Sequence, residues 1–167
     1  MKDWRFVIIF AVLVVAQIVM CNFLDLSRFI FLSILPMLML MLPLRWGNIV
    51  MMLAGFALGF VTDFFSTGML GLTSGPLVFV GLARNFVVNI MFGDELGARE
   101  GELGVTRLGI PRFTLAVLIL TSLFFLIYVG AEDAGTSGGW ELLLRFVLST
   151  LVSTLVSVPV ASLLRSE

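Results

Sequence analysis

Histidine is absent from this chain of 167 residues, and cysteine occurs once, as Cys21. These side chains are the usual ligands of zinc, haem and iron–sulfur clusters, and histidine is the usual base beside a serine or cysteine nucleophile. We therefore expect no metal, no cofactor and no catalytic triad. Charge is also scarce: 13% of the residues are charged, and the net charge is -1. A nucleic-acid partner is excluded, because it would require a basic face.

Apolar residues dominate instead. They make up 60% of the chain, and the mean hydropathy of +1.14 is far above that of an ordinary soluble domain. They form six blocks separated by charged or Gly/Pro-rich breaks, and a helix needs about 20 such residues to cross a bilayer. The sequence predicts an all-α integral membrane protein, with residues 1–167 forming a single six-helix transmembrane domain in one bundle.

The predicted spans cover residues 6–23, 29–42, 46–65, 76–92, 113–129 and 140–164. The second is short, because only about 24 Å of helix fits between Arg28 and Arg45. It also contains Pro36, so it must kink, dip or thin the bilayer. The fourth is expected to begin at SGP, residues 74–76, with a capping serine or glycine before a proline at the first helical position.

An alternative interpretation concerns the first 21 residues, which resemble a secretion signal ending in a lipid-modified Cys21. Met20 stands where a small residue is needed, so a retained first span is the better interpretation.

Lysine and arginine indicate the orientation, because they are held on the cytoplasmic side of a membrane. With the N-terminus inside, the outer side holds Arg28 and Arg145, and the inner segments hold Lys2, Arg5, Arg45, Arg99, Arg107, Arg112 and Arg165. Both termini are therefore predicted to be cytoplasmic, and Trp4, Trp46 and Trp140 then mark span ends. The longest inner loop, 92–112, carries mixed charge and is either a solvated connector or a docking surface.

One carboxylate lies within an apolar stretch of the sequence. In GFALGFVTDFF, residues 55–65, Gly55, Gly59 and Asp63 are spaced four apart and share one face of the third span. Paired glycines let a neighbouring helix approach closely, so this face is predicted to contact protein, either another helix of the bundle or a partner.

The fourth span supplies further polar groups: Arg84, Asn85 and Asn89. In a simple hairpin Arg84 lies roughly 9 Å along the axis from Asp63, more than a direct ion pair tolerates. Three interpretations stay open for the intramembrane polar network of Asp63, Arg84, Asn85 and Asn89: a structural pair or water-bridged network, a contact to another membrane protein, or a polar ligand site. An enzyme is not expected, because an arginine stays charged and is a poor proton donor.

The stretch GFALGFVTDFFSTGMLGLTSGPLVFVGLARNFVV, residues 55–88, resembles the central region of the bacterial rod shape-determining protein MreD family. In that family a glycine-paired span ends in an aspartate, followed by a short Gly-containing loop and a span that leads to an arginine. The likeness extends to the six-span layout, the length and the two short termini.

The resemblance implies a non-enzymatic scaffold subunit of the cell-elongation machinery in the bacterial cytoplasmic (inner) membrane. Its implied partner is the bitopic protein MreC, with MreB filaments, RodA and its transpeptidase partner as neighbours. MreD-like folds are similar to substrate-binding subunits of energy-coupling-factor vitamin transporters, which gives the alternative function. Those subunits usually carry two alanines four apart in the first span, whereas Ala11 and Ala16 are five apart here.

Overall fold

The computed structural model describes residues 2–23, 31–42, 46–67, 69–96, 110–133 and 139–165. Regular structure in these residues is entirely helical, with no strand, so the fold is all-α. The elements are α1 (Lys2–Phe23), α2 (Leu35–Met41), α3 (Asn48–Thr62), the π-helical turn η1 (Asp63–Thr67), α4 (Ser74–Leu96), α6 (Ile110–Asp133) and α7 (Gly139–Arg165). Most of the inner loop predicted over 92–112 lies outside the described residues.

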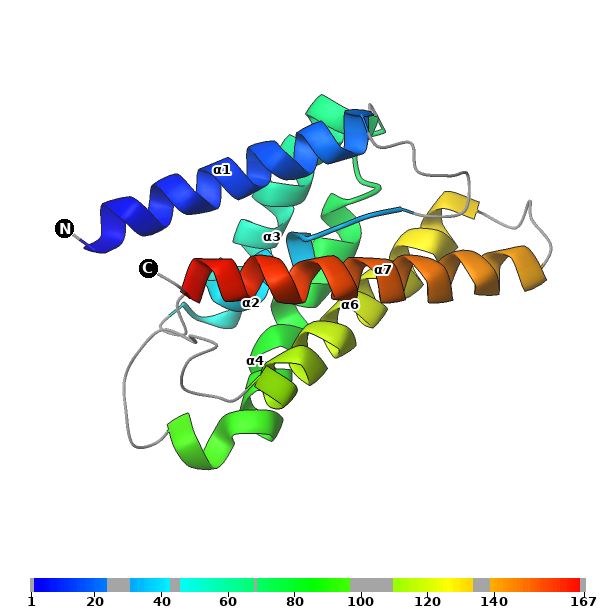
Figure 1. Ribbon diagram of the computed structural model, residues 1–167. Coiled ribbons are helices and arrows are strands. Elements are labelled where there is room, and N and C mark those ends of the chain that lie inside the picture. Colours follow the sequence, from blue (N-terminus) through cyan, green and yellow to red (C-terminus); the bar gives the residue numbers. More distant parts are fainter. Residues whose placement is uncertain are drawn as a thin grey trace.

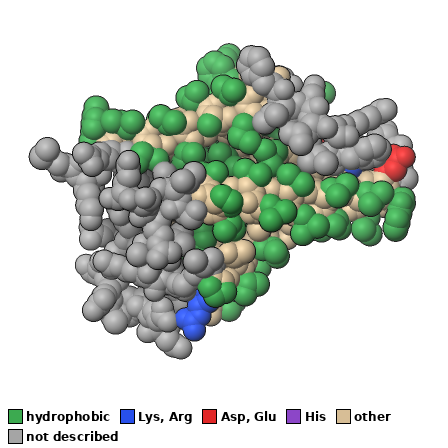
Figure 2. Space-filling view, viewed as in Figure 1, with side chains coloured by type: hydrophobic (Ala, Val, Ile, Leu, Met, Phe, Trp, Pro, Cys, Tyr) green, Lys and Arg blue, Asp and Glu red, His purple; other side chains and the backbone are tan. Residues whose placement is uncertain are grey.

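Among the described residues, four helices are long and apolar enough to cross a membrane, and the stretches that qualify are Asn48–Ser66, Ser74–Met91, Pro111–Glu132 and Gly139–Ala161. A shorter apolar stretch, Ile8–Asn22, lies in α1. Hydrophobic side chains cover much of the described surface in Figure 2, and the charged side chains in view lie at its ends. The prediction of an integral membrane protein is confirmed at this level.

The second predicted span is not a continuous helix, and that expectation was wrong. Only Leu35–Met41 is helical, about 10 Å long. Residues 31–34 before it are not helical, and of these only the N-cap Ile34 accepts a helical hydrogen bond, from Leu38 N at 3.1 Å. Pro36 explains where the helix begins, since proline is tolerated in a first turn but in a helix interior clashes with the carbonyl four residues earlier. The whole of 32–40 is buried, so this segment lies inside the bundle.

The helices pack around this buried segment. α4 packs most extensively on α3, α6 packs on α4 and α7, and α2 contacts α1, α3, α4 and α6. Figure 1 shows α3 and α4 as an antiparallel hairpin, and it shows the start of α1 and the end of α7 on the same side of the molecule. Aromatic rings fill the interior near the extended residues: Phe31 stacks on Tyr128 with ring centroids 4.6 Å apart.

Candidate functional site

Asp63 begins η1, directly after α3, and its buried carboxylate binds backbone N–H groups of the following turn. Its Oδ1 accepts from Thr73 N at 2.9 Å, and its Oδ2 accepts from Gly71 N at 3.0 Å and Ser74 N at 3.1 Å. Ser74 is the first residue of α4, whose N-terminal N–H groups favour an anion. Asp63 therefore closes the α3–α4 turn and caps α4.

The backbone of this turn depends on glycine at one position. Gly71 has a φ of +105°, a backbone conformation that residues other than glycine rarely adopt. Its carbonyl accepts from Gly75 N at 3.0 Å, while its N–H donates to Asp63. The expected cap of α4, a serine or glycine of 74–76, is thus replaced by a carboxylate from eleven residues earlier.

The glycine face of α3 is filled by α4 of the same chain. A β-carbon at Gly55 would lie 2.5 Å from Leu77 O, and one at Gly59 would lie 2.3 Å from Ser74 Cα. Both contacts are with backbone, so the helices approach as closely as glycine allows. This face is a helix-packing face, and α4 leaves no room on it for a partner helix.

Gly81 completes the contact from the α4 side, and its role was not predicted from the sequence. Its β-carbon would lie 2.7 Å from Met51 O on α3. The signal was present, because a close helix pair needs small residues on both helices.

Arg84 lies in α4 and is fully buried. Its Nη2 donates to Leu40 O at 3.2 Å and also to Leu42 O, so the guanidinium binds the C-terminal end of α2. A cation is favourable there, because the last carbonyls of a helix lack helical partners and carry partial negative charge.

Asn85 joins Arg84 to the surface of the bundle. Its Oδ1 accepts from Arg84 Nη1 at 3.4 Å, and its Nδ2 donates to Oδ1 of the exposed Asn48. Asn89, one turn further along α4, is exposed.

The predicted polar network is therefore divided. Asp63 binds the start of α4, whereas Arg84 lies ten residues, or about 15 Å, further along that helix and binds the end of α2. Each group satisfies backbone atoms where a helix begins or ends. The described hydrogen bonds of the two charged residues thus lie at different helix ends, because each charge meets peptide groups close to its own position.

A third set of polar side chains, which binds the backbone of residues 31–34, was not predicted from the sequence. The backbone of the non-helical residues 31–34 makes few local hydrogen bonds, and side chains from two helices take the place of a neighbouring strand. Phe31 N donates to Ser149 Oγ at 3.0 Å, and Ser33 N donates to Ser153 Oγ at 3.0 Å. Ser149 and Ser153 are four residues, or about 6 Å, apart along α7, which matches alternate residues of an extended chain, about 6.6 Å apart.

Gln17 of α1 completes this arrangement from the other side. Its Oε1 accepts from Ile34 N at 2.8 Å, and its Nε2 donates to Leu32 O at 3.0 Å. The signal was the repeat STLVSTLVS, residues 149–157, which places serines every four residues on an otherwise apolar helix.

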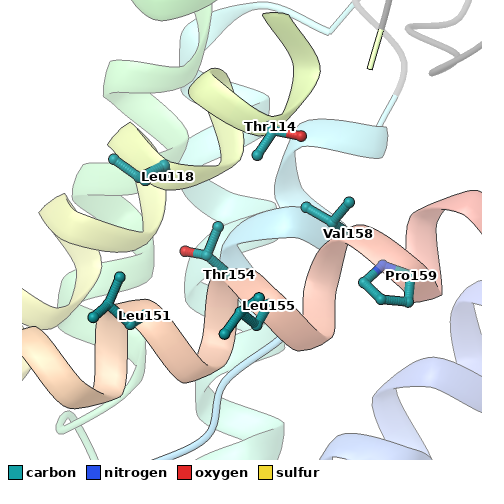
Figure 3. Close-up of a pocket in the computed structure, with 7 residues that line it drawn as sticks. All are labelled: Thr114, Leu118, Leu151, Thr154, Leu155, Val158 and Pro159. Atoms are coloured by element: carbon teal, nitrogen blue, oxygen red, sulfur yellow. The ribbon is translucent and has the colours of Figure 1, made fainter. Parts of the chain in front are cut away.

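Two apolar pockets open on the surface of the described part of the chain. A cleft of about 370 Å³ between α6 and α7 is lined by Thr114, Leu118, Leu151, Thr154, Leu155, Val158 and Pro159, which Figure 3 shows on the two helices. A groove of about 580 Å³ runs between α1 and α3, with Val14 and Leu58 among its lining residues. Neither lining contains a titratable side chain.

No family model, no curated protein and no solved structure matches this chain. The resemblance to the MreD family therefore rests on residues 55–88 and the layout of spans.

Proposed function

We propose that this chain is a non-enzymatic scaffold subunit of the bacterial inner membrane, of the MreD type, which binds the transmembrane helix of an MreC-like bitopic protein. It crosses the membrane six times with both termini in the cytoplasm. The second crossing combines the non-helical residues 31–34 with α2, and this irregular backbone is tolerated in the membrane because protein surrounds it.

The observation that supports the proposal is that polar and small residues of the α3–α4 hairpin hold helices of the same chain together. The carboxylate of Asp63 and the close contact at Gly59 fix the two helices against each other. The guanidinium of Arg84 holds α2 against the same hairpin. Both charged groups therefore hold helices of the bundle in place, as a rigid scaffold requires.

The outer surface of this hairpin is left for a partner. On α4 the exposed side chains of Phe79, Leu82, Phe86 and Ile90 recur at helical spacing, and we call this set the α4 ridge. Phe86 is 68% exposed, and large aromatic side chains of this kind anchor protein interfaces.

Site-specific photo-crosslinking tests the proposal. A photoreactive phenylalanine analogue is placed at Phe79 or Phe86 in the full chain, in cells that also make the bitopic protein. We expect a crosslink to that protein's transmembrane helix from either ridge position. Leu155 is the matched control, because it is 71% exposed on α7, away from the ridge.

Two results would overturn the proposal. One is equal crosslinking to the bitopic protein from Leu155 and from the ridge. The other is a stoichiometric vitamin, found by mass spectrometry of the protein purified from native membranes, together with an associated ATPase pair; this result would favour the transporter function.

A further inference from the structure

Arg84 carries a charge that the described residues do not neutralise. Its side chain is fully buried, and its described acceptors are the two carbonyls and the amide oxygen given above. Its Nε has no hydrogen-bond partner, and no salt bridge to it occurs within the described part of the chain. The end of the seven-residue α2 offers at most a partial negative charge. A buried cation of this kind favours an anion nearby.

The side-chain amides of Asn85 and Asn48, which we call the amide relay, connect Arg84 to one place on the surface. Asn85 accepts from the guanidinium and donates to Asn48, so the oxygen of Asn48 is occupied and its amide N–H groups are left as donors. The relay therefore presents a donor at its outer end, with the positive charge behind it.

The start of α3 adds further donors beside that amide. Asn48 is the first residue of the 15-residue α3, and the preceding Gly47 has no side chain to cap the helix. The N–H groups of Asn48, Ile49 and Val50 therefore have no partner within the helix, and the helix dipole is positive here. All three residues are exposed.

The position in the membrane identifies the anion. Asn48 is also the first residue of the apolar stretch Asn48–Ser66, so it lies where the hydrocarbon ends. Trp46, 39% exposed and two residues earlier, is of the type found at headgroup level. Exposed apolar side chains continue from this point into the span, among them Ile49 and Leu53 on α3.

We propose that Asn48, Asn85 and Arg84, together with the N-terminal N–H groups of α3, form a site for the phosphate of an anionic phospholipid. The phosphate accepts from Asn48 and from the start of α3, and the charge of Arg84 reaches it through Asn85. The acyl chains lie along the exposed apolar side chains at the start of α3.

Lipid-dependent thermal stability of the full-length protein tests this site. The protein is purified in a zwitterionic detergent and titrated with phosphatidylglycerol, phosphatidylcholine or inorganic phosphate, and the melting temperature is followed. We expect phosphatidylglycerol to half-saturate the stabilisation at about one tenth of the phosphatidylcholine concentration, a ratio equivalent to about 1.4 kcal/mol. Inorganic phosphate is expected to have little effect.

Three exposed amide variants sharpen the test. Asn48→Asp places a carboxylate at the end of the relay, so it should neutralise Arg84 within the chain and abolish the preference for phosphatidylglycerol. Asn48→Ala removes the donor and should reduce the preference to about threefold or less. Asn89→Ala is the control, because this exposed amide lies outside the relay and its loss should leave the preference unchanged.

The proposal is overturned if Asn48→Asp keeps the parent's preference, or if Asn89→Ala loses it to the same extent. It is also overturned if inorganic phosphate alone reproduces the stabilisation, since the site would then bind a soluble anion.

Discussion

Replacing Asp63 with asparagine tests the central contact of the α3–α4 hairpin. The change keeps the size of the side chain but removes its charge and converts one acceptor oxygen into a donor. The asparagine amide N–H groups would then face at least one of the three backbone N–H groups that Asp63 now accepts, those of Gly71, Thr73 and Ser74. That N–H group would be left buried without an acceptor.

The expected loss follows from these contacts. A hydrogen bond to a charged group contributes about 1.5–3 kcal/mol, and the two bonds that remain become weaker once the charge is gone. We expect Asp63→Asn to lower the free energy of unfolding by about 2–4 kcal/mol. Equilibrium unfolding in mixed micelles, with increasing denaturing detergent and helix content as the signal, measures this difference.

The matched control is Glu132→Gln. Glu132 is also an acid, but it is exposed and has a partly exposed partner, Arg145, at 3.2 Å. A surface pair of this kind contributes about 0–1 kcal/mol. Should Asp63→Asn cost no more than Glu132→Gln, the carboxylate does not hold the hairpin together, and the reasoning fails.

Two further predictions use the same unfolding measurement. Gly59→Ala would place a β-carbon 2.3 Å from the backbone of α4 and should cost about 1–3 kcal/mol; Gly130→Ala, where nothing lies within 4 Å, should be neutral or stabilising by up to about 1 kcal/mol, and equal costs would contradict the close contact. Ser153→Ala leaves the buried N–H of Ser33 without its acceptor and should cost about 1–3 kcal/mol. Its control, Ser122→Ala, affects only a bond within its own helix and should stay within about 0.5 kcal/mol, and a similar loss in both would refute the role of Ser153.

The sequence predicted the long helices well, because a run of apolar residues between charged breaks has few other structures available to it in lipid. Four of the six predicted spans correspond to long helices at nearly the expected positions. The close approach at Gly55 and Gly59 was also foreseeable, since glycines four apart on one helix face have a direct steric meaning.

The partners of the buried charges were not foreseeable in the same way. Asp63 was compared with Arg84 because opposite charges attract, but its acceptor oxygens are used by N–H groups of residues 71–74. Every residue except proline carries such an N–H group, so the sequence does not show which ones a turn will point at a carboxylate. The turn itself, with Gly71 at positive φ, creates that arrangement.

One physical requirement connects the three polar groups inside this bundle. Within a membrane, backbone N–H and C=O groups outside regular helix have no water to hydrogen-bond with. Side chains must therefore supply their hydrogen-bond partners. Asp63 does so where α4 begins, Arg84 does so where α2 ends, and Ser149, Ser153 and Gln17 do so along the non-helical residues 31–34. Isolated polar residues in an apolar sequence of this kind therefore indicate nearby breaks in helices as much as contacts with one another. On this reasoning, the buried charges belong to the architecture of the bundle, and functional contacts are to be sought on its exposed surface, on the α4 ridge and at Asn48.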